Sequence, residues 1–217
     1  MRGLYPIVDL DALQKVSNSP QKITEFAQLA LSVRPALLQL RAKHAGARET
    51  LALLRALRPL CTATGTHLIA NDRPDLAILA ECDGVHVGQE DLPLAVVREL
   101  GPKLLVGVST HDPEQLIAAL AEKPDYVAFG PVYGTVSKER PDPTVGLAGL
   151  IRAHEAALAH GIPLVAIGGI DLARAAEIHA HCELGAVIGA LLPEPNSLSG
   201  VGEAARALHR ALGGDES

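Results

Sequence analysis

The stretch "HLIANDRPD" (residues 67–75) is a short apolar run that ends in an amide, a carboxylate, a guanidinium and a proline. The run has the length of one buried strand, and the segment "RPDLA" that follows is a plausible start for a helix. A buried strand followed directly by a helix is one unit of an α/β fold. The same unit recurs along the chain.

Short runs rich in Val, Ile and Leu also occur at 4–9, 36–41, 84–88, 104–109, 126–130, 163–169 and 185–190. Apolar residues at helical spacing lie between these runs, as at Ile23, Phe26, Ala27, Ala30 and Leu31, and again at Leu51, Leu53, Leu54, Leu57 and Leu60. Eight strand and helix units predict a closed parallel (β/α)8 barrel, with about 27 residues per unit and few insertions. An open doubly wound sheet is the alternative, but no GxGxxG follows the first run.

Length and composition favour one domain over residues 1–217, with residues 213–217 as a frayed tail and 136–146 as a long loop. Hydrophobic residues make up 48%, yet no apolar run is long enough to cross a bilayer and the N-terminus turns acidic early. We therefore expect a soluble cytoplasmic protein without a membrane partner. Cys61, Cys82 and Cys182 are too few and too far apart for a disulfide framework, which predicts buried free thiols.

The charge pattern argues against a nucleic-acid partner. The net charge is −6, positive and negative residues are interspersed, and the chain contains no Trp and few other aromatic residues. Nucleic-acid binding would need a basic surface or an aromatic stacking platform. A local cationic cluster could still bind a small anionic substrate, and the oligomeric state, homo-oligomers included, is left open.

Polar residues follow the predicted strands where the rim of a barrel carries its active site. In "QLRAK", alternation places Gln39, Arg41 and Lys43 on one side of the strand and Leu40 and Ala42 on the other. Two cations on one side favour an anion between them, and an Arg with a Lys suits a diphosphate. The alternative is a pair of solvated cations beyond a strand end.

Two acids complete this half of the rim. Asp72 and Asp91 follow neighbouring strands, and Mg²⁺ typically takes one or two protein carboxylates together with substrate phosphate oxygens. Asn71 could donate to a phosphate, whereas Arg73 could simply pair with a nearby acid. The alternative for Asp72 is a helix cap. We interpret His86 as structural and His111 as a supporting neighbour of the site.

Glycines end the last two strands, at Gly168, Gly169 and Gly189. This is where barrels commonly bind a phosphate through backbone N–H groups, here without a charged side chain, although each run could also be a tight turn. The rim would then hold two separate anion sites. Such an arrangement suits an enzyme that joins a diphosphate to a monophosphate.

The motifs "QLRAK", "ANDRPDLA", "DGVHVGQEDLP", "GVST", "FGPVYGTVSK" and "AIGGI" resemble, in this order and over almost the whole chain, those of the thiamine-phosphate synthase family. The resemblance implies a (β/α)8 barrel and a magnesium-dependent transferase of thiamine biosynthesis. It would join 4-amino-2-methyl-5-(diphosphooxymethyl)pyrimidine to 4-methyl-5-(2-phosphooxyethyl)thiazole and release pyrophosphate. In the family the C–O bond to pyrophosphate breaks first, and the thiazole nitrogen captures the pyrimidinylmethyl cation.

The resemblance also implies roles for individual residues. Asp72 and Asp91 would hold Mg²⁺, and Arg41, Lys43, Ser109 and Lys138 would be catalytic. The residues expected to contact the pyrimidine diphosphate are Gln39, Leu40, Arg41, Ala42, Lys43, Asn71, Ser109 and Lys138. Those expected to line the thiazole phosphate site are Thr135, Val136, Ser137, Gly169, Ile188 and Gly189.

The chain departs from the family pattern at the thiazole side. Gly134 stands where the loop usually has a proline, Ser137 replaces a threonine, and Gly189 aligns with a common serine, so the alignment over 187–189 is uncertain by one position. Two rival interpretations are a thiazole tautomerase, which needs neither diphosphate nor magnesium, and a non-catalytic binder of thiamine phosphates. The joint presence of Asn71, Asp72 and Asp91 with Lys138 favours the synthase.

Overall fold

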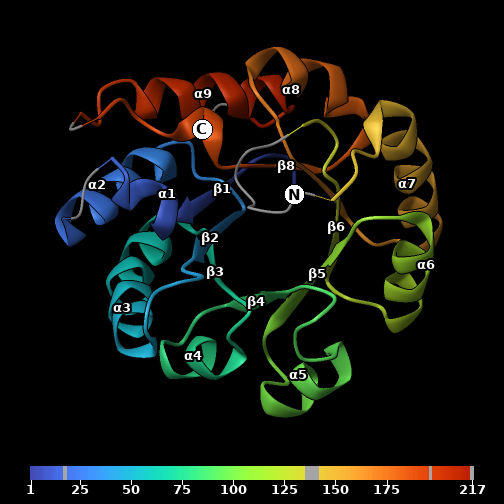
Figure 1. The fold of residues 1–217 in the computed structure, drawn as a ribbon, viewed down its shortest axis with the longest axis horizontal. Helices are drawn as coiled ribbons and strands as arrows, with labels where there is room; N and C mark the ends of the chain where they lie inside the picture. The colour runs from blue at the N-terminus through green and yellow to red at the C-terminus, as the bar shows by residue number, and fades with distance from the viewer. Residues whose placement is uncertain (17–18, 135–141, 196, 216–217) are drawn as a thin grey trace.

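A closed barrel of eight parallel strands forms the centre of the computed structural model, and helices form a ring around it (Figure 1). The structure describes residues 1–16, 19–134, 142–195 and 197–215. The strands are β1 Gly3–Asp9, β2 Leu37–Arg41, β3 His67–Asn71, β4 Gly84–Val87, β5 Leu105–Thr110, β6 Tyr126–Phe129, β7 Leu164–Ile167 and β8 Leu184–Val187. Each strand pairs with the next and β8 pairs with β1, so the predicted (β/α)8 barrel is confirmed.

The helices follow the strands in the predicted alternation. They are α1 Leu10–Gln14, α2 Pro20–Leu31, α3 Ala47–Thr64, α4 Pro74–Leu79, α5 Leu94–Leu100, α6 Pro113–Glu122, α7 Gly146–His160, α8 Leu172–Ile178 and α9 Val201–Ala211, with short 3-10 turns η1 His179–His181 and η2 Gly189–Leu191. The last two strands end earlier than expected. The run 163–169 leaves strand geometry after Ile167, and the run 185–190 leaves it after Val187, where Ile188 adopts a helical backbone conformation at the start of η2.

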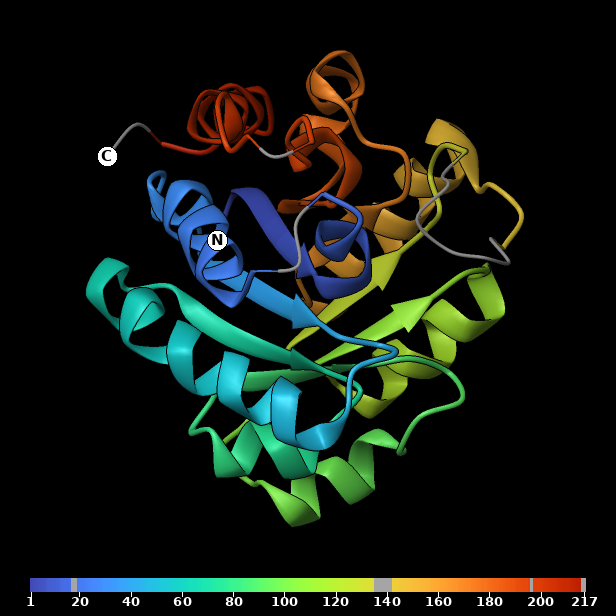
Figure 2. The same ribbon diagram turned by 60° about the vertical axis from the view of Figure 1, so that its left-hand side comes forward.

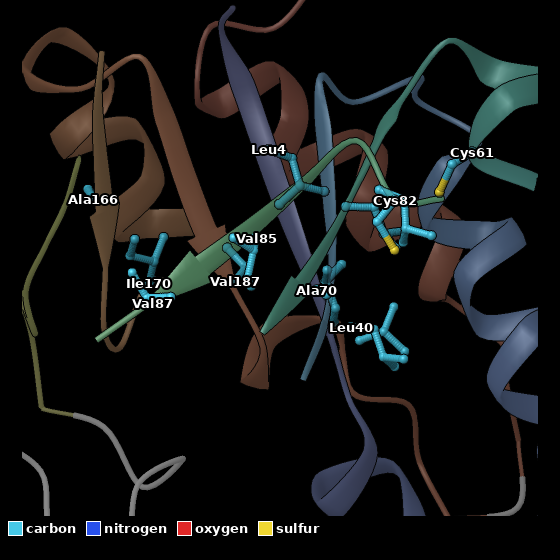
Figure 3. Close-up of a cluster of buried hydrophobic side chains, with 14 of the residues drawn as sticks. Leu4, Leu40, Cys61, Ala70, Cys82, Val85, Val87, Ala166, Ile170 and Val187 are labelled. Atoms are coloured by element: carbon cyan, nitrogen blue, oxygen red, sulfur yellow. The ribbon is translucent and has the colours of Figure 1, made fainter. Parts of the chain in front are cut away.

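Alternation along each strand separates two hydrophobic clusters. Side chains such as Leu38 and Leu40 point outward into the main core between strands and helices, whose members include those in Figure 3. Leu37, on the opposite face of β2, belongs to a smaller cluster inside the barrel. The side chains of even-numbered residues of β2 therefore pack under the helices, and those of odd-numbered residues point into the barrel.

Two tyrosines fill much of the barrel interior. The rings of Tyr5 and Tyr126 are about 1% exposed and meet edge to face with centroids 6.0 Å apart. Gly107 on β5 makes this possible, because a Cβ there would lie 2.0 Å from the Tyr126 ring. The missing side chain at Gly107 on β5 leaves room for the Tyr126 ring from β6, and the interior stays densely packed.

The outer layer is closed by the last helix. α9 packs against α2 and β1, so the end of the chain covers the same side of the barrel as its beginning (Figure 2). Cys61, Cys82 and Cys182 are buried and free, as predicted. Within the described ranges, no helix is both long enough and apolar enough to cross a bilayer.

An acid precedes three of the even-numbered strands at the amino-terminal rim. Each carboxylate accepts a hydrogen bond from a backbone N–H of the preceding strand, and each also contacts a basic side chain from the helix that leads into that preceding strand. The sets are Asp83 with Leu68 and Arg58, Asp125 with Val106 and Arg98, and Glu183 with Leu164 and His154. These clamps lie at the end of the barrel away from the strand termini that carry the site, where polar contacts serve stability.

We predict that Asp83→Ala lowers the free energy of unfolding by about 1–3 kcal/mol, because the N–H of fully buried Leu68 loses its acceptor, 2.8 Å away. Urea denaturation monitored by circular dichroism measures this. Asp75→Ala is the matched control, because Asp75 is 56% exposed and its ion pair is with the surface residue Arg73, so its loss should cost less than about 0.5 kcal/mol. Equal costs for the two variants would contradict the clamp.

Candidate active site

A cavity of about 420 Å³ opens at the carboxyl-terminal rim of the barrel. Most of the described residues that the sequence assigned to the site line it together. They are Gln39, Arg41, Lys43, Asn71, Asp72, Asp91, Ser109, Gly169, Ile188 and Gly189. Thr135, Val136, Ser137 and Lys138 lie outside the described residues. Their roles stay predictions.

Leu40 and Ala42 do not line the cavity. Leu40 is 1% exposed within the outer core, and Ala42 packs against the same cluster. Alternation along β2 accounts for this placement, as the sequence analysis expected for the two side chains. Their predicted contact with substrate would have to come from backbone atoms.

Arg41 is held by an acid that the sequence analysis did not assign to the site. Asp9, at the end of β1, is 3% exposed and forms an ion pair with Arg41 through one carboxylate oxygen. Its other oxygen accepts from the N–H of Ala12, 2.9 Å away, and so caps α1. Asp9 and Arg41 are register partners in the β1–β2 ladder, so the strand pairing fixes the direction of the guanidinium.

Lys43, Asp72 and Asp91 form a second charged cluster beside Arg41. The Lys43 ammonium lies 2.9 Å from the Asp72 carboxylate, and the Asp91 carboxylate accepts from the N–H of Gly88 at 2.7 Å. Burial raises the pKa of Asp91 above its ordinary value, and its hydrogen bond with Asp72 and the charge of that carboxylate raise it further. The cluster therefore crowds two acids around one lysine.

This crowding is the observation that fits a divalent cation. Mg²⁺ takes one or two carboxylates and completes its shell with water and substrate phosphate oxygens. No group of three or more His, Cys, Asp or Glu side chains with metal-binding geometry occurs among the described residues. The donor set of Asp72 and Asp91 suits magnesium and lacks the nitrogen and sulfur ligands typical of zinc.

The local backbone directs Asp72 toward this cluster. Its φ of 61° is unusual for a residue with a side chain, and its N–H donates to the carbonyl of His86 at 2.8 Å. The alternative of a helix cap is wrong, because α4 has Arg73 at its N-cap position and no side-chain cap. Arg73 pairs with exposed Asp75, as the sequence suggested.

Ser109 also lines the cavity and lies on β5, the strand next to β4. Its hydroxyl is 2.8 Å from Nε2 of His86, and Nδ1 of His86 is 3.1 Å from the hydroxyl of Tyr126. His86 also stacks on the Tyr126 ring at 5.5 Å between centroids. His86 is therefore both packed and in direct contact with a predicted site residue. His111 lines the cavity as well, with Nδ1 2.6 Å from the carbonyl of Gly130.

The glycine turn after β7 forms the other end of the cavity. Gly169 has a φ of 64°, and a Cβ there would lie 2.4 Å from the carbonyl oxygen of Gly134, so the turn requires glycine. Among the described residues, none accepts a hydrogen bond from the Gly169 N–H. Around Gly189, by contrast, no described atom lies within 4 Å of the position that a Cβ would take.

A cation accompanies this glycine turn, which the sequence analysis missed. Arg174 on α8 lines the cavity, donates to the carbonyl of Gly169 at 2.6 Å and lies 4.8 Å over the ring of Tyr133. Asp171 lies 3.7 Å from its Nε. Its position five residues beyond Gly169 could have made Arg174 a candidate. Nothing in the sequence showed that the Arg174 side chain contacts the glycine turn.

The fold and cavity define a (β/α)8 barrel whose cavity at the carboxyl ends of its strands is lined by cationic side chains, two acids and glycine turns. The family model for thiamine monophosphate synthase matches residues 4–191. The chain belongs to this family, as the motifs indicated.

Individual relatives agree with this assignment. The chain is 40% identical over 196 residues to a thiamine-phosphate synthase of Methanospirillum hungatei, covering 89% of this chain and 91% of that protein. It is 43% identical over 198 residues to one of Koribacter versatilis, covering 88% and 90%. Among solved structures, a thiamine phosphate pyrophosphorylase from Pyrococcus furiosus superposes with a TM-score of 0.81 and 29% identity, covering 97% of this chain and 95% of that one.

We predict that Asp9→Asn lowers kcat/KM for the diphosphate substrate by about tenfold, because the amide keeps the cap of α1 but no longer neutralises and orients Arg41. KM for the monophosphate substrate should change by less than about twofold. Steady-state kinetics with each substrate varied in turn measure both. Asp112→Asn is the matched control, since Asp112 caps α6 in the same way without a described cationic partner. Equal effects of the two substitutions would rule out the clamp on Arg41.

Proposed function

We propose that the chain is a thiamine-phosphate synthase and that the cavity is where its two substrates meet. It joins 4-amino-2-methyl-5-(diphosphooxymethyl)pyrimidine to 4-methyl-5-(2-phosphooxyethyl)thiazole, forming thiamine phosphate and pyrophosphate. One observation carries the assignment of the site: a single cavity has Arg41, Lys43 and an acid pair at one end and the Gly168–Gly169 turn at the other. Two phosphorylated substrates can therefore be held facing each other.

The diphosphate occupies the end with Arg41 and Lys43. When the C–O bond breaks, negative charge increases on the departing pyrophosphate, so cations fixed in advance stabilise the transition state more than the bound substrate. The Asp9 carboxylate keeps the Arg41 guanidinium in place before substrate arrives. Lys43 would exchange its partner Asp72 for a phosphate oxygen, and Asn71 would donate from its amide. Lys138 keeps its predicted role on the leaving group.

Asp72 and Asp91 would hold Mg²⁺ at this end. The ion would neutralise charge on the diphosphate oxygens and so assist departure of pyrophosphate. Burial and the neighbouring Asp72 carboxylate both raise the pKa of Asp91, and the charge of the ion would offset both effects. Lys43 is 45% exposed and can move away from Asp72 as the ion enters.

The thiazole phosphate occupies the glycine end. The N–H of Gly169, which no described residue accepts, and the open space around Gly189 would accommodate a phosphate group, with Arg174 adjacent. Fixing this phosphate places the thiazole nitrogen opposite the pyrimidine methylene, so the chain contributes chiefly position and charge stabilisation. The captured cation needs no protein nucleophile or general base.

The cellular location, the partners and the oligomeric state remain predictions. Three buried free thiols suit the reducing cytoplasm, which we keep as the location of the protein. The partners are the two small-molecule substrates. A homo-oligomer stays a prediction without a specific interface.

Purified protein incubated with both substrates and Mg²⁺ should release pyrophosphate and thiamine phosphate in equal amounts, with neither product formed when one substrate is omitted. Coupled spectrophotometry and chromatography measure the two products. A thiazole tautomerase would convert its substrate without the pyrimidine diphosphate, and a binding module would retain both compounds unchanged. Either result would overturn the proposed activity.

Asp72→Ala and Asp91→Ala should each remove most turnover, and excess Mg²⁺ should restore little, because the metal loses a ligand. Calorimetric titration of pyrophosphate provides a readout independent of turnover: Mg²⁺ should strengthen its binding to the native chain but not to either variant. Asp75→Ala, an exposed acid just beyond the site, is the control and should behave as the native chain. If Mg²⁺ strengthened pyrophosphate binding in both variants as much as in the native chain, the metal assignment would be wrong.

Gly189→Ser should lower KM for the thiazole phosphate by about tenfold, because the added hydroxyl enters open space and can donate to a charged acceptor. KM for the pyrimidine diphosphate should stay within about twofold. The matched variant Gly169→Ser should instead impair thiazole binding, since its Cβ would collide with Gly134. Weaker thiazole binding in Gly189→Ser would show that this glycine does not face the phosphate.

A further inference from the structure

Five polar side chains form one connected chain of hydrogen bonds across the barrel interior, here called the interior chain. Gln39 Nε2 donates to the Tyr5 hydroxyl at 2.8 Å, and the hydroxyls of Tyr5 and Tyr126 are 2.9 Å apart. The Tyr126 hydroxyl is 3.1 Å from Nδ1 of His86, whose Nε2 is 2.8 Å from the Ser109 hydroxyl. The interior chain thus joins predicted substrate contacts on β2 and β5.

Burial makes each link of the interior chain consequential. Tyr5 and Tyr126 are 1% exposed, Gln39 is 2% and His86 is 7% exposed. A buried polar group without a partner costs the full desolvation penalty, so these groups keep their hydrogen bonds. Burial also raises the pKa of both phenols above the ordinary value, so both hydroxyls retain their protons. Each tyrosine therefore has one proton to donate.

The direction of the interior chain follows from its first member. The Gln39 amide N–H can only donate, so the Tyr5 oxygen accepts from it. Either hydroxyl could donate in the Tyr5–Tyr126 pair, but the buried Tyr5 proton has no other acceptor among the described residues, so it is directed to the Tyr126 oxygen. The Tyr126 proton is then directed to Nδ1 of His86, which must carry a lone pair. The proton of the neutral imidazole consequently lies on Nε2 and is donated to the oxygen of Ser109. The Ser109 oxygen accepts from His86, so its own proton is available to a group in the cavity.

We infer that His86, Tyr126 and Tyr5 are positioning residues that fix Ser109 as a hydrogen-bond donor toward the substrate. Ser109 lines the cavity together with Tyr5 and His86, whereas Tyr126 does not and is connected to Ser109 through His86. The matching ligand group is an acceptor with a lone pair, such as a ring nitrogen of an aminopyrimidine. A ring that presents N–H at this point leaves two donors opposed, which disfavours it. The inference rests on the proposed function for the identity of the substrate.

The tautomer of His86 can be measured without substrate. In protein labelled with ¹⁵N-histidine, the signals of His86 are assigned by their loss in His86→Asn. We expect a protonated Nε2 and an unprotonated Nδ1. In Tyr126→Phe the phenyl ring still stacks on His86 but the donor to Nδ1 is gone, so the signals should shift toward a mixture of tautomers. Tyr133→Phe is the matched control, because its hydroxyl donates to Glu177 instead. A proton on Nδ1 in the native chain overturns the inference.

A double-mutant cycle tests whether Tyr126 acts through Ser109. Tyr126→Phe should lower kcat/KM for the pyrimidine diphosphate by about tenfold in the native background. In the Ser109→Ala background the same substitution should change it by less than about twofold, because the group it orients is already absent. A tenfold loss in both backgrounds, or no loss in the native one, overturns the inference.

The two experiments separate this inference from the proposed function. A chain that forms no thiamine phosphate would refute the function while the tautomer of His86 still reports the direction of the interior chain. Should Tyr126→Phe fail to fold, the native spectrum alone decides that direction. Synthesis of thiamine phosphate with a proton on Nδ1 would support the function and overturn the inference.

Discussion

Closure of eight parallel strands into one barrel is the constraint on which the rest of the structure depends. It brings the carboxyl ends of all strands to one rim, so residues separated by more than a hundred positions line the same cavity. It also divides each strand into a face under the helices and a face inside the barrel. On β2 the first face carries Leu40, and the second carries Gln39 and Arg41. The site is therefore a consequence of strand register.

The barrel can hold charged groups near its centre because they are paired before any substrate arrives. Asp9 neutralises Arg41 from the adjacent strand, and Asp72 does the same for Lys43. An unpaired buried charge would be far more costly than the pair. Asp91 differs, because burial raises its pKa and the hydrogen bond with Asp72 and the charge of that carboxylate raise it further. Paired cations and crowded acids are together the arrangement expected of a site that awaits a metal and a diphosphate.

The sequence was sufficient for the fold and for much of the site, because both depend on local patterns. Apolar runs located every strand to within about three residues, and polar residues after them identified Arg41, Asp72 and Ser109 as neighbours at one rim. Alternation predicted correctly that Leu40 would point away from them.

The features that the sequence could not predict depend on contacts between residues that are far apart in the sequence. Asp9 was not singled out in the sequence, and the register of β1 with β2 shows that it holds Arg41. His86 was interpreted as structural. Its link to Ser109 depends on packing around Tyr126, which the sequence does not reveal. Arg174 was recognisable only as a cation five residues beyond Gly169, and its contact with the glycine turn depends on how α8 is placed beside that turn. Pairwise geometry of this kind is invisible to periodicity and motif spacing.

The central claim is that one cavity holds two phosphate-bearing groups at opposite ends. A crystal structure of the protein with Mg²⁺, pyrophosphate and thiamine phosphate tests it most directly. The account predicts pyrophosphate against Arg41 and Lys43, a metal ion between Asp72 and Asp91, and the thiamine phosphate group over Gly169 and Gly189. Both phosphorylated products at the same end, or a metal ion away from the two aspartates, would contradict it.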